Sequence, residues 1–140
     1  MSARDPQVGD VFAVRGRSVL GRVVSTDAVV GPTHGCLLVY VYRDSTLSRD
    51  ALLVPPMLTT RAPFLRGLFV LQLQLQRRAS RPLLSGEYFE VHGFRDSAGR
   101  LLDELGRPLE AASPGAPVGS YRLLDAGGVE DALAATDVRA

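Results

Sequence analysis

The sequence contains no lysine and no tryptophan, a single cysteine and two histidines. The one cysteine, Cys36, excludes an internal disulfide framework and is typical of a reducing compartment. No apolar run approaches the roughly 20 residues that a bilayer span requires, and the first residues lack the apolar stretch of a secretory signal. These absences predict a cytoplasmic protein that does not associate with a membrane.

The charges nearly balance, because 16 basic residues face 15 acidic ones and give a net charge of +1. Such a balance leaves no bulk positive charge to hold a nucleic-acid backbone. All the basic residues are arginines, whose planar, forked donors suit carboxylate recognition better than an ammonium group does. The charge pattern therefore predicts no nucleic-acid partner.

The size of the chain indicates one domain with a real core. It has 140 residues, of which 46% are hydrophobic, and a chain of this length buries roughly two thirds of its unfolded surface. We expect a single domain over 5–136, with tails at 1–4 and 137–140.

The first elements predicted are two strands that form a hairpin. The apolar run 11–14 follows the turn residues Gly9 and Asp10, passes a cationic turn, and returns through 19–24. Gly21, inside the returning strand, indicates a bulge or a close backbone approach.

Further strands follow from apolar runs and from alternation. The run 36–42 is apolar on both faces, which predicts a central strand, and leucines alternate with glutamines within 67–76. The other predicted strands are 87–92 and 121–124, and 49–54 forms either a short strand or a helical turn.

Turns and one helix complete the predicted fold. Two successive tight turns begin at Asp96, and 129–135 forms a short helix with acidic residues in its first turn. Short strands with turns every ~8–12 residues predict a mainly β (α+β) fold. We expect a strongly bent antiparallel sheet or a small SH3-like barrel with one short C-terminal helix.

Residues that could carry catalysis are few. Cys36 and His92 could form a nucleophile pair, but Cys36 begins an apolar run, where an inert buried thiol is usual. The two histidines and the cysteine do not have the spacing of a zinc site, and no glycine-rich phosphate-binding motif occurs. We therefore expect no catalytic residue, no metal and no cofactor.

The opening of the chain carries a resemblance to a known family. Gly-Asp-Val-Phe-Ala-Val at 9–14, followed by Leu-Gly-Arg-Val-Val at 20–24, resembles the start of the immunity protein 26 family of bacterial polymorphic toxin systems. The resemblance implies a non-enzymatic protein that binds and neutralises a cognate toxin and so protects the producing cell.

An inhibitor of this kind needs a few anchor residues, most often Trp, Tyr or Arg. Because tryptophan is absent, arginine and tyrosine have to supply the anchors. The candidate partner-binding residues lie in turns and connections: Arg15, Arg17, Arg43, Asp44, Arg77, Arg78 and Arg81.

Two other functions remain open on the sequence alone. An endoribonuclease toxin of the PemK-like class also begins with Gly-Asp-hydrophobic on an SH3-like barrel, and Arg22 or Arg17 would then be its catalytic group. A β-barrel that binds a small ligand is the third alternative.

Overall fold

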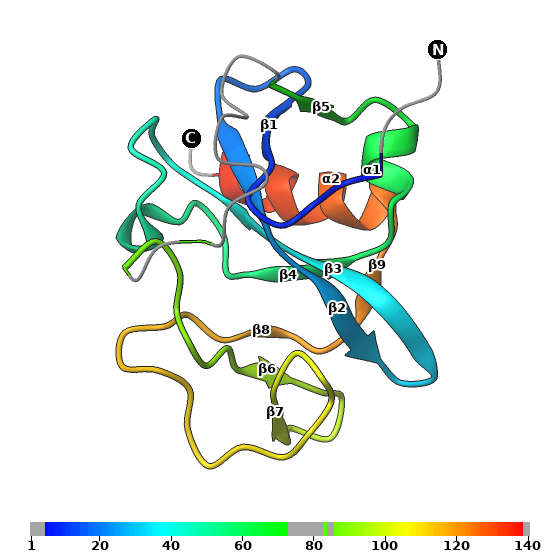
Figure 1. Ribbon diagram of the computed structural model, residues 1–140, viewed down its shortest axis with the longest axis vertical. Helices are drawn as coiled ribbons and strands as arrows, with labels where there is room; N and C mark the ends of the chain where they lie inside the picture. Colours follow the sequence, from blue (N-terminus) through cyan, green and yellow to red (C-terminus); the bar gives the residue numbers. More distant parts are fainter. Residues whose placement is uncertain (1–4, 73–82, 84–85, 139–140) are drawn as a thin grey trace.

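The structure is a computed structural model that describes residues 5–72, 83 and 86–138 (Figure 1). Within these residues the fold is mainly β, with one six-stranded and one three-stranded sheet. Two α-helices pack on one face of the larger sheet, and the smaller sheet lies beyond its other face. None of the helices in these residues has both the length and the apolar content of a membrane span.

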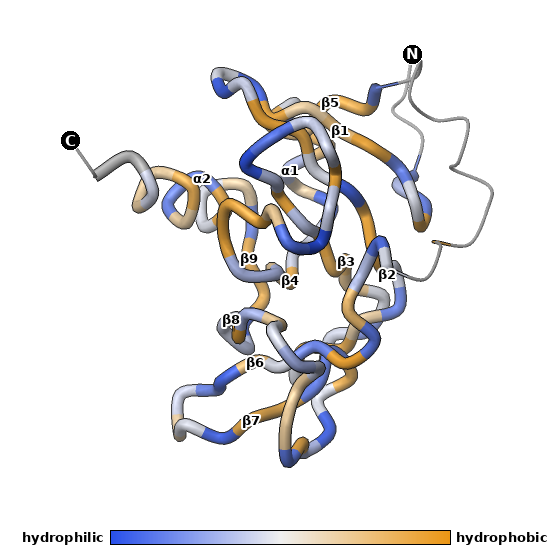
Figure 2. The backbone as a smooth tube through the Cα atoms, turned by 90° about the vertical axis from the view of Figure 1, so that its left-hand side faces the viewer, coloured by the Kyte–Doolittle hydropathy of each residue, from blue (hydrophilic) through white to orange (hydrophobic). Residues whose placement is uncertain are grey.

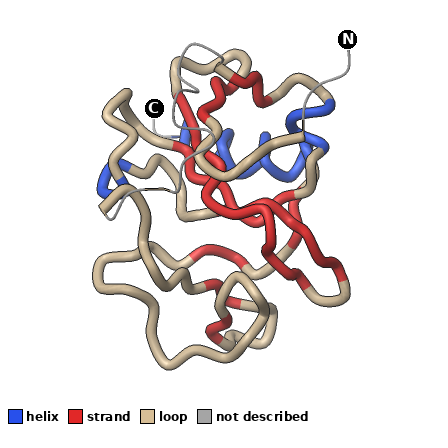
Figure 3. The backbone as a smooth tube through the Cα atoms, viewed as in Figure 1, coloured by secondary structure: helices blue, strands red, loops and turns tan. Residues whose placement is uncertain are grey.

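The larger sheet has the strand order β5-β1-β2-β3-β4-β9. Its long central pair crosses the molecule in Figure 3. Neighbouring strands are antiparallel except β4 and β9, which are parallel, so the sheet is mixed. The strands are β1 (Val11–Val14), β2 (Leu20–Val30), β3 (Thr33–Val41), β4 (Met57–Thr59), β5 (Phe69–Leu71) and β9 (Leu123–Leu124).

The described strands do not close into a barrel. β5 and β9 are the two edges of the larger sheet, so the sheet is open, and the expected SH3-like barrel is not found in these residues. The expectation of a mainly β fold with a short C-terminal helix is confirmed.

The hairpin of β1 and β2 is confirmed, and Gly21 explains how closely it packs. Gly21 pairs in register with Phe12, and a Cβ at this position would overlap the Phe12 ring and lie 2.6 Å from the carbonyl oxygen of Tyr40. The register shifts of β2 lie further along, beyond Val23. Gly21 is therefore a point of close approach rather than a bulge.

The two faces of the larger sheet form two cores. Side chains alternate along β2 and β3, so Val23 and Val39 join the cluster under the helices. Val24 and Tyr40 join the cluster on the opposite face. The expected central strand at 36–42 is confirmed as part of β3, where every residue from Cys36 to Val41 is buried.

The helices are α1 (Ala62–Leu65) and α2 (Ala126–Ala134), with 3-10 turns η1 (Arg49–Ala51) and η3 (Ala135–Val138). Helix α2 begins earlier than 129, because the side chain of Asp125 accepts a hydrogen bond from the N–H of Gly128 and caps the helix. The expected acidic first turn is therefore wrong, since Glu130 and Asp131 lie beyond it.

The smaller sheet consists of β6 (Phe94–Arg95), β7 (Leu101–Leu102) and β8 (Gly119–Ser120). β7 is flanked by two turns of the same sequence pattern, Asp-x-x-Gly-Arg, which begin at Asp96 and Asp103. In each turn the aspartate accepts the backbone N–H of the arginine four residues later at 2.9 Å, and also its side-chain Nε–H. The turns around β7 are hydrophilic, whereas β7 itself is apolar (Figure 2).

The strand expected at 87–92 is wrong. The backbone N–H groups of Phe89 and Val91 donate to side chains, the hydroxyls of Tyr40 and Ser113, each at 3.0 Å. Because side chains satisfy these groups, the segment has no strand ladder, and regular pairing begins only at β6. Of the strand expected at 67–76, β5 is found, and 73–76 lie outside the described residues.

Candidate functional site

The cationic turn between β1 and β2 is held by backbone hydrogen bonds. The N–H of Arg17 donates to the carbonyl of Val14 at 3.1 Å, and Gly16 takes φ 81°, a conformation that glycine adopts without strain. The N–H of Arg15 donates to the carbonyl of Leu68 at 2.8 Å. The turn is thereby attached to the segment that leads into β5.

A groove lies between this turn and helix α2. One part, of about 420 Å³, is lined by Arg15, Gly16, Arg17, Leu68, Glu130, Leu133 and Ala134. The adjoining part, of about 510 Å³, is lined by Arg15, Arg66, Leu68, Ala126, Gly127 and Glu130. Because both parts share Arg15, Leu68 and Glu130, we treat them as one site and name it the Arg15 groove.

The Arg15 groove is cationic with a partly apolar floor. Three arginines line it, and among the described residues of its lining one, Glu130, is acidic. Arg15 and Arg66 are exposed, whereas Leu68 and Leu133 below them are buried. Such a surface can hold an anionic group beside an apolar contact.

The other predicted partner-binding residues lie away from this groove. Arg43 and Asp44 follow β3 and are exposed. Arg43 donates to the carbonyl of Asp50 at 3.3 Å, and hydrogen bonds from the side chain and backbone of Thr46 lower the pKa of Asp44. Arg77, Arg78 and Arg81 lie outside the described residues.

The turn residues before β1 are part of the framework. Gly9 takes φ 90° and donates its N–H to the carbonyl of Val23 at 2.8 Å. Asp10 is fully buried and its carboxylate accepts the N–H of Gln7 at 2.9 Å. These contacts attach the start of β1 to β2.

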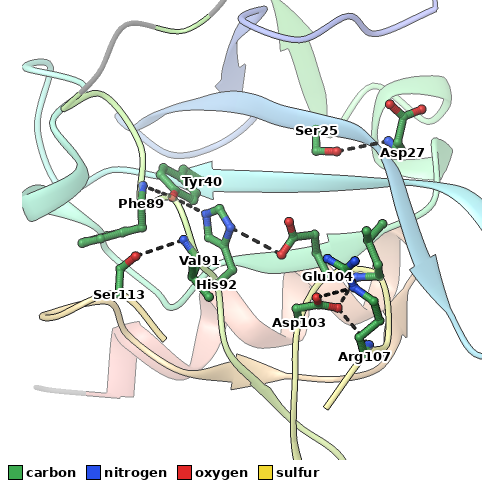
Figure 4. Close-up of polar contacts among 11 residues, drawn as sticks. Ser25, Asp27, Tyr40, Phe89, Val91, His92, Asp103, Glu104, Arg107 and Ser113 are labelled. Carbon is green, nitrogen blue, oxygen red and sulfur yellow. Dashed lines mark hydrogen bonds and ion pairs between the residues drawn. The ribbon is translucent and has the colours of Figure 1, made fainter. Parts of the chain in front are cut away.

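A buried polar network lies on the sheet face opposite the helices (Figure 4). The hydroxyl of Tyr40 lies 2.6 Å from Nε2 of His92 and accepts the N–H of Phe89. The Tyr40 hydroxyl and Nε2 share one hydrogen bond, and the tautomer of His92 sets which of the two donates. Nδ1 lies 3.7 Å from a carboxylate oxygen of Glu104. Burial raises the pKa of Tyr40, so the hydroxyl keeps its proton.

A second buried group lies on the same face. The side chain of Arg22 is 4% exposed, and its Nη1 lies 3.5 Å from a carboxylate oxygen of Glu87. Burial raises the pKa of Tyr42 to about 12, and its hydroxyl has no hydrogen-bond partner among the described residues. Arg22 is thus enclosed by the fold, and little of its side chain is accessible.

The nucleophile pair considered from the sequence is not formed. His92 is engaged with Tyr40, and the thiol of Cys36 donates to the carbonyl of Thr33 at 3.4 Å. Burial raises the pKa of Cys36, which disfavours the reactive thiolate. In the part of the chain that the structure describes, no three His, Cys, Asp or Glu side chains gather as a metal site requires.

Two features of these sites were missed from the sequence. Arg66 is the C-cap of helix α1, and the pairing of β1 with β5, together with the hydrogen bond from the Arg15 N–H to Leu68, brings it beside the first turn. The Tyr40–His92 bond joins residues far apart in the chain. A signal for it existed, since a tyrosine in an otherwise apolar strand needs a partner for its hydroxyl.

Comparison of the chain with known protein families, with curated protein sequences and with solved structures finds no match.

Proposed function

We propose that this protein is an immunity protein that binds a cognate bacterial toxin in the cytoplasm and neutralises it. The resemblance of 9–14 and 20–24 to the immunity protein 26 family suggests this function. The observation that carries it in the structure is the Arg15 groove, where Arg15 and Arg17, from the turn between the two resembling segments, line a cationic concavity. Arginine is among the residues that most often anchor protein interfaces.

The placement of the reactive side chains supports a binding protein over an enzyme. Cys36, His92 and Arg22 are each at least nine-tenths buried and contact other groups of the fold. General acid–base or nucleophilic work requires such a group within hydrogen-bond reach of a substrate. Arg15 and Arg66, the exposed arginines of the groove, are instead suited to recognition.

The attachment of the first turn favours tight binding. Its backbone is fixed by the hydrogen bonds of Arg15 and Arg17, so a partner does not have to order the loop when it binds. Preorganisation of this kind lowers the entropic cost of association. Standard inhibitor interfaces bury ~800 Å² per partner, so we expect the interface to extend beyond the groove over the neighbouring surface.

The function is tested by co-expression with the toxin encoded beside the gene. We expect the toxin alone to arrest growth, the pair to restore it, and the two proteins to co-elute as a stoichiometric complex. A non-cognate toxin expressed at the same level serves as the control and should not be neutralised.

Two results would contradict the proposal. One is growth arrest that persists although the protein is present in excess over the toxin. The other is cleavage of RNA by the purified protein, abolished by Arg17→Ala or Arg22→Ala, which would establish the PemK-like alternative instead.

A further inference from the structure

We infer that the Arg15 groove binds an acidic segment of the partner protein, with carboxylates at the arginines and an apolar side chain against the floor. The inference rests on the proposed function and specifies the chemistry of the partner. Three observations carry it: the charge of the lining, the position of the Arg15 guanidinium, and the hydrogen-bonded backbone of the segments that carry the arginines.

The charge of the lining favours an anionic occupant. Three arginines and one glutamate line the groove, so the site is positive although the whole chain carries only +1. In the described part of the chain, the guanidinium groups of Arg15 and Arg66 enter no ion pair. A carboxylate would therefore add a new charge-assisted hydrogen bond without displacing an existing one.

Arg15 and Arg66 line the same part of the groove. A Cβ added to Gly67, the residue after Arg66, would lie 3.7 Å from Nη1 of Arg15, so the Arg15 guanidinium lies beside the backbone that follows Arg66. Like charges held near each other repel, and an anion between them relieves the repulsion. Arg15 and Arg66 are thus the pair that we expect a carboxylate to bridge.

Hydrogen bonds hold the backbone of both segments that carry these arginines. The turn is tied to Leu68 through the N–H of Arg15 at 2.8 Å, and the N–H of Arg66 donates to the carbonyl of Ala62 at 2.8 Å. The floor is apolar at Leu68, Leu133 and Ala134. A partner segment that pairs carboxylates with one apolar side chain complements both parts of this surface.

A protein segment fits this groove better than a nucleic acid does. Single-stranded nucleic acids bind where aromatic side chains stack on bases, and none of the described residues that line the groove is aromatic. The net charge of +1 likewise provides little attraction for a phosphate backbone. Binding of RNA is therefore an outcome that the test must be able to detect.

The test uses a hexapeptide with a leucine and a phenylalanine between pairs of acidic residues. Its amide counterpart, with glutamine and asparagine at the acidic positions, and a uridine hexanucleotide serve as comparisons. Binding is followed by NMR titration up to millimolar peptide, with the backbone of Leu68 and Ala134 and the Arg15 Nε–H as reporters. We expect the acidic peptide to shift these signals and to bind at least tenfold more tightly than the amide peptide.

Charge-reversal variants connect binding to the groove. Arg15→Glu combined with Arg66→Glu should weaken binding of the acidic peptide at least tenfold. Arg122→Glu makes the same change per residue at an exposed arginine outside the groove and should alter it less than twofold. Circular dichroism and the thermal midpoint establish that each variant is folded, and Arg15→Ala with Arg66→Ala replaces the double reversal if it is not.

The inference is overturned if the acidic peptide leaves the reporters unmoved at millimolar concentration. Equal binding of the amide peptide, tighter binding of the hexanucleotide, or unchanged binding by the double variant would each overturn it too. Co-expression separates it from the proposed function. If the wild type and the double variant neutralise a toxin equally, the binding of the partner at the groove is refuted and the immunity function stands. If the peptide binds but no toxin encoded beside the gene is neutralised, the immunity function is refuted and the groove still stands as a binding site for acidic segments.

Discussion

Tyr40 and Tyr42 provide a matched pair for testing the buried polar network. Both side chains are fully buried in the cluster on the sheet face opposite the helices. The centroids of their rings lie 6.1 Å apart. They differ in their hydroxyls, because that of Tyr40 contacts two polar groups and that of Tyr42 has no hydrogen-bond partner among the described residues. Replacing each by phenylalanine removes one oxygen and preserves the ring.

The expected losses of stability differ strongly. Tyr40→Phe leaves the Phe89 N–H and the His92 Nε2 without their partner in a buried place, and a stranded polar group costs ~1–3 kcal/mol. We therefore expect Tyr40→Phe to lower the free energy of unfolding by about 2–4 kcal/mol. Tyr42→Phe removes a hydroxyl that gains no hydrogen bond within the described structure, so it should change stability by less than ~0.5 kcal/mol or raise it.

The measurement is urea denaturation at neutral pH, followed by fluorescence and circular dichroism. The m-value should stay constant, and the midpoint should fall clearly for Tyr40→Phe alone. In a thermal scan the same loss corresponds to a decrease in Tm of roughly 10 °C for a chain of this size. Equal losses for the two variants, or a larger loss for Tyr42→Phe, would refute the assignment of these hydrogen bonds.

Two further predictions concern the sheet and the repeated turns. Gly21→Ala should cost about 3 kcal/mol, because its Cβ would overlap the Phe12 ring and overpacking costs of this order are usual for such clashes. Urea denaturation measures it. Gly16→Ala is the comparison, because there a Cβ has open space and only the positive φ strains it; a smaller loss for Gly21→Ala than for Gly16→Ala would contradict the prediction. Burial alone would raise the pKa of Asp103, but hydrogen bonds from Arg107 and Leu105 outweigh burial and lower it below its usual value of 3.8. Its contribution to stability is therefore present above about pH 4 and is lost as pH falls through the folded pKa, so Asp103→Asn should flatten the fall of the urea midpoint between about pH 5 and pH 3. An unchanged acid profile would show that the carboxylate is not held in this way.

The local elements of the fold could be predicted from the sequence. The hairpin of β1 and β2 follows from a turn between two apolar runs, and β3 follows from its apolar composition. Such signals depend on neighbours in the chain, which a sequence displays directly. The parallel pairing of β4 with β9 joins Leu58 to Leu123, and no local pattern marks a contact over that separation.

The error at 87–92 has the same origin. An aromatic-containing run predicts a strand, but the hydroxyls of Tyr40 and Ser113 accept two of its backbone N–H groups instead. Tertiary contacts thus overrode local preference. Of the arginines that line the groove, Arg15 and Arg17 were candidates from the sequence because they belong to a visible turn, whereas Arg66 comes beside them through the pairing of β1 with β5.

The two Asp-x-x-Gly-Arg turns around β7 share one local design but differ in their attachment to the rest of the fold. Each turn is closed by bonds within its own five residues, and the second begins seven positions after the first, at Asp103 rather than Asp96. The second turn is also attached to the larger sheet, because the carbonyl of Glu104 accepts the N–H of Val29 in β2 at 2.8 Å. A change in the first turn can therefore reshape one end of the molecule by itself, whereas a change in the second also reaches the six-stranded sheet.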